Sequence, residues 1–138
     1  MTPTTASRPP PQVPLATPFG EIMRRAVEST PGAIGGAFAD AEGEMVDGYT
    51  TIDRDEWAII TAHYGVVLVN LHSAFNTMHF GSPKYFIAQY ERMDVIVQSV
   101  AMGYFALLAV RDSNGASPLG AALASLEIAA AALAKEIT

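Results

Sequence analysis

Three histidines, at positions 63, 72 and 79, are the residues of this sequence best suited to metal chemistry. His63 and His72 are nine residues apart, which on a helix places them about 180° apart around the axis. His72 and His79 are about two helical turns apart, too far to share one zinc ion without another ligand. We therefore predict no metal site and interpret the three histidines as polar positions on a helix.

Other arrangements that carry chemistry are incomplete. The glycines at 32, 35 and 36 lack the Lys-Ser/Thr that ends a phosphate-binding loop, and they lie inside an expected strand. The sequence has no Gly-x-Ser-x-Gly around a nucleophilic serine. Glu42 and Glu44 are close together, but on an expected hairpin tip, where no cleft would make one an acid and the other a base. We predict neither an enzyme nor a cofactor.

Composition excludes further classes. The 138 residues contain no cysteine, so there is no disulfide framework and no thiolate nucleophile. Eight Lys and Arg against 14 Asp and Glu give a net charge of −6, opposite to what phosphate binding needs. We expect no nucleic-acid partner. The first residues show no secretory signal pattern, and we predict a cytoplasmic protein.

Two apolar stretches, residues 58–71 and 119–134, raise the question of a membrane span. Both are shorter than the roughly 20 strongly apolar residues that a bilayer requires. His63 and Asn70 interrupt the first stretch, and Glu127 interrupts the second. We predict that both are core helices and that the chain does not insert into membranes.

The rest of the chain divides into a tail and one domain. Six of the nine prolines lie within the first 18 residues, which predicts a disordered tail over residues 1–15 and one domain over 16–138. Residue periodicity, turn signals and capping residues predict three helices and five strands. The first helix runs from Thr17 or Pro18 to Pro31, the second from Asp53 or Asp55 to about Met78, and the last is capped by Ser117 with Pro118 at its first position. The strands are expected at 33–40, 45–50, 84–90, 94–100 and 104–110. Helix-strand-strand-helix-strand-strand-strand-helix predicts a layered α/β (α+β) domain with helices on both faces of the sheet.

The middle helix carries two apolar rows. The first row contains Trp57, Ile60, Tyr64, Val67, Leu71, Phe75 and Met78, and we expect it to face the sheet. The second row contains Ile59, Ala62, Val66, Val69 and Ser73. One sheet covers only one row, so the second row predicts contact with another polypeptide. Arg54, Asp55 and Glu56 at the start of the helix fit helix capping, or a polar rim around that contact.

The element order and four local features resemble the roadblock/LC7 family, whose sheet is profilin-like. The features are Pro31-Gly32 before a small-residue strand, the hairpin at 40–43, the long apolar helix, and Gly103-Tyr104-Phe105 leading into a strand and a capped last helix. The resemblance covers about residues 18–137 and is to the bacterial branch that partners a Ras-like GTPase in gliding and cell polarity. That branch has no active-site motif.

The resemblance implies a homodimer in which second strands pair and second helices lie side by side. It therefore places Met45, Val46, Asp47, Gly48, Tyr49, His63 and Asn70 in the dimer interface. It also implies a Ras-like small GTPase or another roadblock protein as partner, and the second row of the middle helix is the predicted partner surface. Three functions stay open: a GTPase regulator, a scaffold for another roadblock protein or a response-regulator-type adaptor without effect on GTP hydrolysis, and a small-molecule sensor. Trp57, Tyr64 and Phe75 argue against the sensor, because they would fill its cavity.

Overall fold

A computed structural model describes residues 17–76, 80–111 and 118–138. The predicted tail, the loop at 112–115, Met78, His79 and Ser117 lie outside these residues. The described elements are α1 (Pro18–Glu28), β1 (Ala33–Ala39), β2 (Met45–Thr50), α2 (Arg54–Asn76), β3 (Tyr85–Gln89), β4 (Met93–Ser99), β5 (Phe105–Arg111) and α3 (Leu119–Ile137). The predicted order of helices and strands is confirmed.

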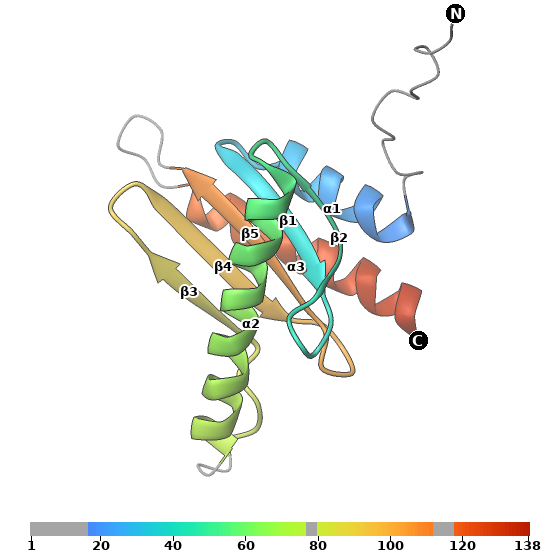
Figure 1. Cartoon of the computed structure of the whole chain (residues 1–138), viewed down its shortest axis with the longest axis vertical. Helices are drawn as coiled ribbons and strands as arrows, with labels where there is room; N and C mark the ends of the chain where they lie inside the picture. Colours follow the sequence, from blue (N-terminus) through green and yellow to red (C-terminus); the bar gives the residue numbers. More distant parts are fainter. Residues whose placement is uncertain (1–16, 77–79, 112–117) are drawn as a thin grey trace, which may run out of the picture.

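The five strands lie in the order β2-β1-β5-β4-β3, and every neighbouring pair is antiparallel. α2 crosses one face of this sheet, while α1 and α3 cover the other face (Figure 1). The lower half of α2 runs past the sheet in this view. β2 and β3 are the two edge strands.

Local chemistry explains where the first elements begin and turn. The Thr17 side chain accepts a 3.0 Å hydrogen bond from the amide of Gly20, which caps α1 in front of Pro18. Between β1 and β2, Asp40 Oδ1 accepts hydrogen bonds from two amides of the turn, at 2.9 and 3.0 Å. Gly43 takes a φ of +88°, a conformation that side chains disfavour. The hairpin is therefore fixed within a few residues.

A separate hydrophobic core fills each side of the sheet. Met23 and Val27 of α1 and Leu126 and Leu133 of α3 pack with Phe38 on one side. α3 buries Leu126, Ala130 and Leu133 on this side, and Leu119, Leu123 and Ile137 pack at the margin. On the α2 side the buried residues are Trp57, Leu68, Phe105, Leu107 and small or β-branched strand residues. That side is covered by one helix instead of two.

The last helix begins one residue later than predicted. Its N-cap position is Pro118, with no capping hydrogen bond from a side chain, and Leu119 is the first helical residue. Proline has no amide hydrogen, so it leaves one fewer donor to satisfy at the start of α3.

Candidate protein-interaction surface

α2 is attached to the sheet through its first two turns. Asp53 caps the helix, accepting a 3.0 Å hydrogen bond from the amide of Glu56. Trp57 is 1% exposed, and its indole Nε1 donates to the carbonyl of Gly36 at 3.1 Å. Gly35 makes room for the indole, because a Cβ there would lie 2.9 Å from the ring. Of the two residues predicted to start this helix, Asp53 and Asp55, the structure confirms Asp53 as the cap.

Farther along, two small residues and one leucine form the buried side of α2. Thr61 is fully buried and bonds back to the carbonyl of Trp57. At Gly65 the helix backbone touches the β1–β2 turn so closely that a Cβ would lie 2.9 Å from the Cα of Gly43. Leu68 completes the row at 5% exposed. The small residues let the helix axis lie close to the sheet. The bulky row that was expected to face the sheet would hold the axis farther away.

This seating corrects the predicted inner row. Val67 and Phe75 were expected against the sheet but are 41% and 40% exposed. Ile60, Tyr64 and Leu71 are only half-buried. The expectation that residues 58–71 form a core helix is also wrong, because α2 is a surface helix for most of its length. Phe75 was expected to fill the space in which a sensor would hold its ligand, but it does not pack between α2 and the sheet.

The outer side of α2 is apolar and uncovered. Ile59, Val66 and Val69 are 59%, 60% and 53% exposed, and at about 100° per residue they lie within about 80° of one another around the helix axis. We call these three residues the outer face. Val67 and Phe75 are also exposed, but Phe75 is nine residues from Val66 and so lies on the opposite side of the helix. All five residues of the predicted partner surface are exposed: Ile59, Ala62, Val66, Val69 and Ser73. His63 and Asn70 also lie exposed on α2, and His63 Nδ1 is 2.8 Å from the carbonyl of Ile59.

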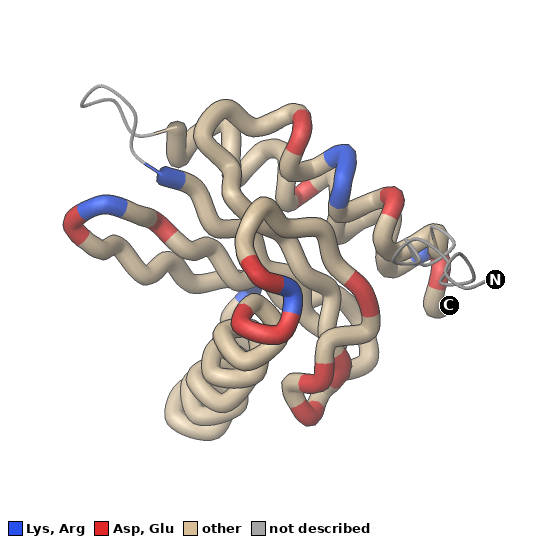
Figure 2. Tube along the Cα trace, turned by 45° about the horizontal axis from the view of Figure 1, so that its top comes forward, with Lys and Arg blue, Asp and Glu red and all other residues tan. Residues whose placement is uncertain are grey.

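α2 carries no charged side chain after its first turn. Asp55 and Glu56 lie in that turn beside Arg54, and the helix is uncharged from there on (Figure 2). By length and composition, α2 is the one helix among the described residues that could cross a membrane. Its most apolar window has a mean hydropathy of 1.4 and is 17% buried. The row from Trp57 to Leu68 packs on the sheet, so the membrane-like composition belongs to the exposed side.

A groove borders the outer face where α2 leaves the sheet. It encloses about 440 Å³ between Val69 and His72 of α2 and the two turns that hold Ala41 and Gly103. On the other flank, the hydroxyls of Tyr64 and Tyr90 lie 2.6 Å apart and connect α2 to the β3–β4 turn. The pKa of Tyr64 is raised above its ordinary value, mainly by burial of the side chain and also by this hydrogen bond. The contact between Tyr64 and Tyr90 helps to fix the orientation of α2 on the sheet.

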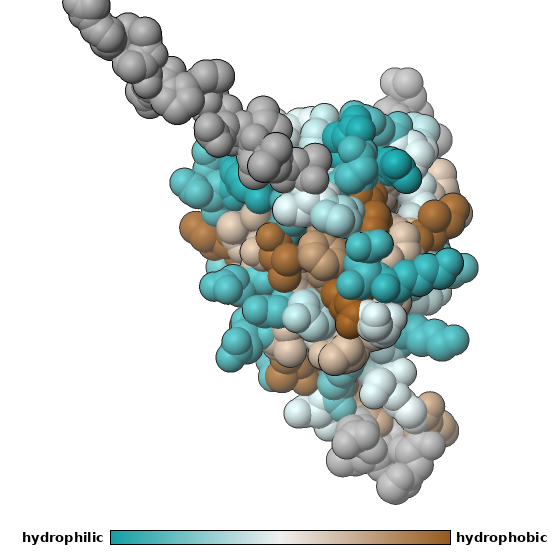
Figure 3. Space-filling view, turned by 90° about the vertical axis from the view of Figure 1, so that its right-hand side faces the viewer, coloured by the Kyte–Doolittle hydropathy of each residue, from teal (hydrophilic) through white to brown (hydrophobic). Residues whose placement is uncertain are grey.

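The β2 edge is less open than the sequence suggested. Met45 packs into the α2-side core and Tyr49 into the α1–α3 core, while Val46 is 43% exposed and Gly48 half-buried. Asp47 was expected at a dimer interface, yet it is 7% exposed. Figure 3 views the molecule from the side of this edge, where hydrophobic and hydrophilic residues interleave.

The Asp47 carboxylate has partners within the chain. It accepts hydrogen bonds from the Thr17 hydroxyl, from the Gly48 amide at 2.8 Å and from Arg54 Nη2 at 3.2 Å. The side chain therefore joins the start of α1 to the start of α2. No local signal could have revealed this, because Thr17 and Asp47 are 30 residues apart in the chain.

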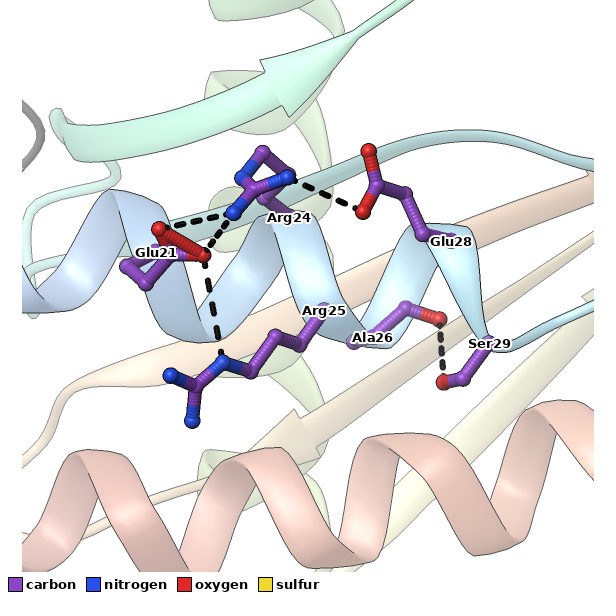
Figure 4. A network of polar contacts seen from close by, with 6 residues as sticks. All are labelled: Glu21, Arg24, Arg25, Ala26, Glu28 and Ser29. Carbon is purple, nitrogen blue, oxygen red and sulfur yellow. Dashed lines mark hydrogen bonds and ion pairs between the residues drawn. The ribbon is translucent and has the colours of Figure 1, made fainter.

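α1 contrasts with α2 in its charges. Arg24 bonds to Glu21 and Glu28 on the exposed side of α1, and Arg25 lies 3.8 Å from Glu21 (Figure 4). The hydrogen bond and the charge of Glu21 raise the pKa of Arg24. The charges of this network are paired with one another and exposed to solvent, so this side of α1 needs no further partner. The exposed side of α2, in contrast, is apolar.

No known family model and no curated protein matches the sequence. Solved structures match in fold. An MglB described with a tetrameric arrangement has a TM-score of 0.76 at 17% identity over 91% of this chain and 94% of its own. Myxococcus xanthus MglB gives 0.76 at 10% identity over 87% of both chains. A roadblock/LC7 domain from Streptomyces avermitilis gives 0.74 at 11% identity, over 85% of this chain and 95% of its own. The chain thus has the roadblock/LC7 fold.

Proposed function

We propose that the protein is a roadblock-type adaptor that acts in the cytoplasm by binding other polypeptides through the outer face of α2. The observation that carries this proposal is the uncharged, half-exposed row of Ile59, Val66 and Val69 on a helix that is otherwise firmly seated. An exposed apolar patch with a polar rim is typical of protein interfaces, and Arg54 with Asp55 provides such a rim.

A second copy of the chain is the first partner that we propose. A patch on one helix can pair with itself about a two-fold axis, which is the commonest symmetry of soluble oligomers. The tetrameric arrangement described for a structurally similar MglB supports self-association of this fold. His63 and Asn70, exposed beside the outer face, would then lie in the dimer contact.

We further propose that the dimer serves a Ras-like small GTPase, in cell polarity or gliding motility. The support is the MglB-like fold together with the sequence resemblance to the bacterial roadblock branch. A scaffold that binds another roadblock protein is the alternative. The bulky side chains of Ile59 and Val66 favour it, because a surface that contacts a GTPase is expected to be less bulky. GTP turnover by the GTPase, with and without this chain, separates the two, since only a regulator changes the rate.

The surface is tested by Val66→Arg, with Ala62→Arg as a second variant. Val66 is 60% exposed, so the change in unfolding free energy should stay within about 0.5 kcal/mol. An unpaired charge buried in an interface costs about 3–5 kcal/mol, so self-association or partner binding should weaken by ~100-fold or more.

Ile128→Arg is the matched control. Ile128 is 74% exposed on α3, in the opposite layer, and has the same size and chemistry as the residues of the outer face. It should change neither stability nor binding. Binding that survives both Val66→Arg and Ala62→Arg, or that Ile128→Arg abolishes equally, removes the outer face as the contact surface.

A further inference from the structure

His63 and Asn70 are polar side chains on the exposed, apolar side of α2. At about 100° per residue, positions seven apart differ by only about 20° around the helix axis, so the two side chains project in nearly the same direction. Along the axis they lie about 10 Å apart, at roughly 1.5 Å per residue. Val66, which belongs to the outer face, lies between them on the same side. This side of α2 therefore alternates polar, apolar and polar over two helical turns.

A hydrogen bond within α2 determines which ring nitrogen His63 offers to a partner. Its Nδ1 lies 2.8 Å from the carbonyl oxygen of Ile59. Since a carbonyl oxygen only accepts, Nδ1 carries the proton and donates. In the neutral ring the other nitrogen, Nε2, is then a hydrogen-bond acceptor. The side-chain amide of Asn70 has the N–H donors that such an acceptor needs.

Within one chain these two side chains cannot meet, because about 10 Å of helix separates them. They meet when the α2 of a second copy lies antiparallel to the first, with a two-fold axis that passes between Val66 and Val67. Position 63 of each copy is then opposite position 70 of the other, and the symmetry makes the contact twice. In a parallel pair, position 63 would face position 63, and two Nε2 acceptors would lie opposite each other without a donor.

The same axis position gives the two helices nearly their full overlap and covers the exposed half of α2. It lies within two residues of Gly65, the middle of the 23-residue helix. Residues 57–68 seat the helix on the sheet, whereas none of residues 69–75 is buried, and this half runs past the sheet (Figure 1). Antiparallel packing lays each overhanging half along the seated half of the partner helix. Parallel packing would only bring the two overhanging halves together.

We propose that two copies of the chain associate through antiparallel α2 helices, and that two reciprocal hydrogen bonds from Asn70 to His63 fix the register. Polar side chains inside an apolar helix contact select one register, because a shift along the helix leaves a buried polar group without a partner. The exposed side chains of Val66 and Val67 flank the axis between the two bonds. The inference rests on the proposed self-association through α2 and adds its direction and its register.

Charged substitutions at the two positions test the register. The variants are His63→Glu, Asn70→Lys and the chain that carries both changes. Both positions are exposed, so the urea midpoints should stay near that of the wild type. Within one chain the two new charges are about 10 Å apart and solvated, so a strong coupling between them arises across the dimer. Sedimentation equilibrium gives each dimerisation constant.

Each single change places two charges in the contact without a partner of opposite sign, so dimerisation should weaken at least about tenfold. The double variant places a carboxylate opposite an ammonium group at both sites, and its dimerisation should return to within about threefold of the wild type. An equimolar mixture of the two single variants should form mainly the heterodimer in native mass spectrometry, because that pair holds one ion pair and one original bond between Asn70 and His63.

Ala124→Glu and Ala131→Lys are the matched control. These positions are also exposed and seven residues apart, but they lie on α3, in the opposite layer. Singly and together, the changes there should leave the dimerisation constant as it is in the wild type. The control separates the effect of facing α2 helices from the effect of an altered net charge.

Two results overturn the register. One is a double variant that dimerises no more tightly than the single variants, as a parallel pair with like charges in contact would. The other is a mixture in which the heterodimer does not exceed the statistical half. Failure of the proposed surface looks different, because Val66→Arg then leaves association of the wild type unchanged. A wild type that stays monomeric up to millimolar concentration removes both proposals.

Discussion

Gly65→Ala probes the contact that sets the position of α2. A Cβ at this position would lie 2.9 Å from the Cα of Gly43 and 3.1 Å from the ring of Phe105. The first neighbour is backbone of the β1–β2 turn, where Gly43 itself has a φ of +88°. Since that turn cannot give way easily, the helix must shift away from it, and the outer face moves with the helix.

Two effects of opposite sign set the magnitude. Alanine in place of glycine inside a helix stabilises by about 1 kcal/mol. Overpacking a tight contact typically costs about 1–3 kcal/mol, and this clash lies in the upper part of that range, about 2–3 kcal/mol, because it involves main chain. The contact should win, so we expect Gly65→Ala to lower the unfolding free energy by about 1–2 kcal/mol. For a chain of 138 residues this corresponds to roughly 3–8 °C in Tm.

Gly120→Ala is the matched control, because nothing lies within 4 Å of a Cβ at Gly120 near the start of α3. It should raise the unfolding free energy by up to about 1 kcal/mol. Urea unfolding of both variants, followed by far-UV circular dichroism, measures the difference. If Gly65→Ala stabilises the protein as Gly120→Ala does, α2 does not rest on the β1–β2 turn and the derived direction of the outer face is wrong.

Two further predictions concern the contacts around α2 and the turns. Met102, in the β4–β5 turn, has a φ of +58° and is 72% exposed. Asparagine suits this backbone conformation better than methionine, so Met102→Asn should raise the unfolding free energy by about 1 kcal/mol. An unchanged or lower urea midpoint would contradict this. Because burial and the bond to Tyr90 raise the pKa of Tyr64, the folded state keeps that proton longer than the unfolded state, and stability should fall as the pH rises above about 10. Tyr64→Phe should lessen this fall in unfolding experiments between pH 8 and 11, and an identical slope in both proteins would refute the assignment to Tyr64.

The strands could be predicted to within about one residue because their signals are local. Asp40 and Gly43 fix the β1–β2 turn through bonds that span at most four residues. Met102 and Gly103 lie in the β4–β5 turn as expected, and the amide of Tyr104 bonds back to the carbonyl of Ala101. Given these turns, alternation of side chains assigns each strand residue to a face of the sheet.

The orientation of α2 could not be predicted in the same way. Sequence reasoning assigned the bulkiest row to the sheet, whereas the helix is seated on its smallest residues, Thr61 and Gly65. Glycine inside a long helix was the signal for close approach, and it was available in the sequence. The outer residues Val66 and Val69 were nevertheless assigned to the exposed side, because a 23-residue helix presents more apolar surface than one sheet contacts.

The contacts of the Asp47 carboxylate could not be predicted from local sequence. The resemblance placed Asp47 in a dimer interface. Its three contacts come from the cap of α1, its own neighbour and the first residue of α2, which only the folded domain brings together. Capping residues predict where helices begin, but not which distant strand their side chains will contact.

Self-association of the purified chain is the decisive measurement for the outer face of α2. Sedimentation from micromolar to millimolar concentration should show a reversible dimer, and Ile59, Val66 and Val69 should lose solvent contact as it forms, as side-chain NMR or hydroxyl-radical footprinting would report. A monomer throughout this range, with these three side chains accessible and no partner protein protecting them, would contradict the account.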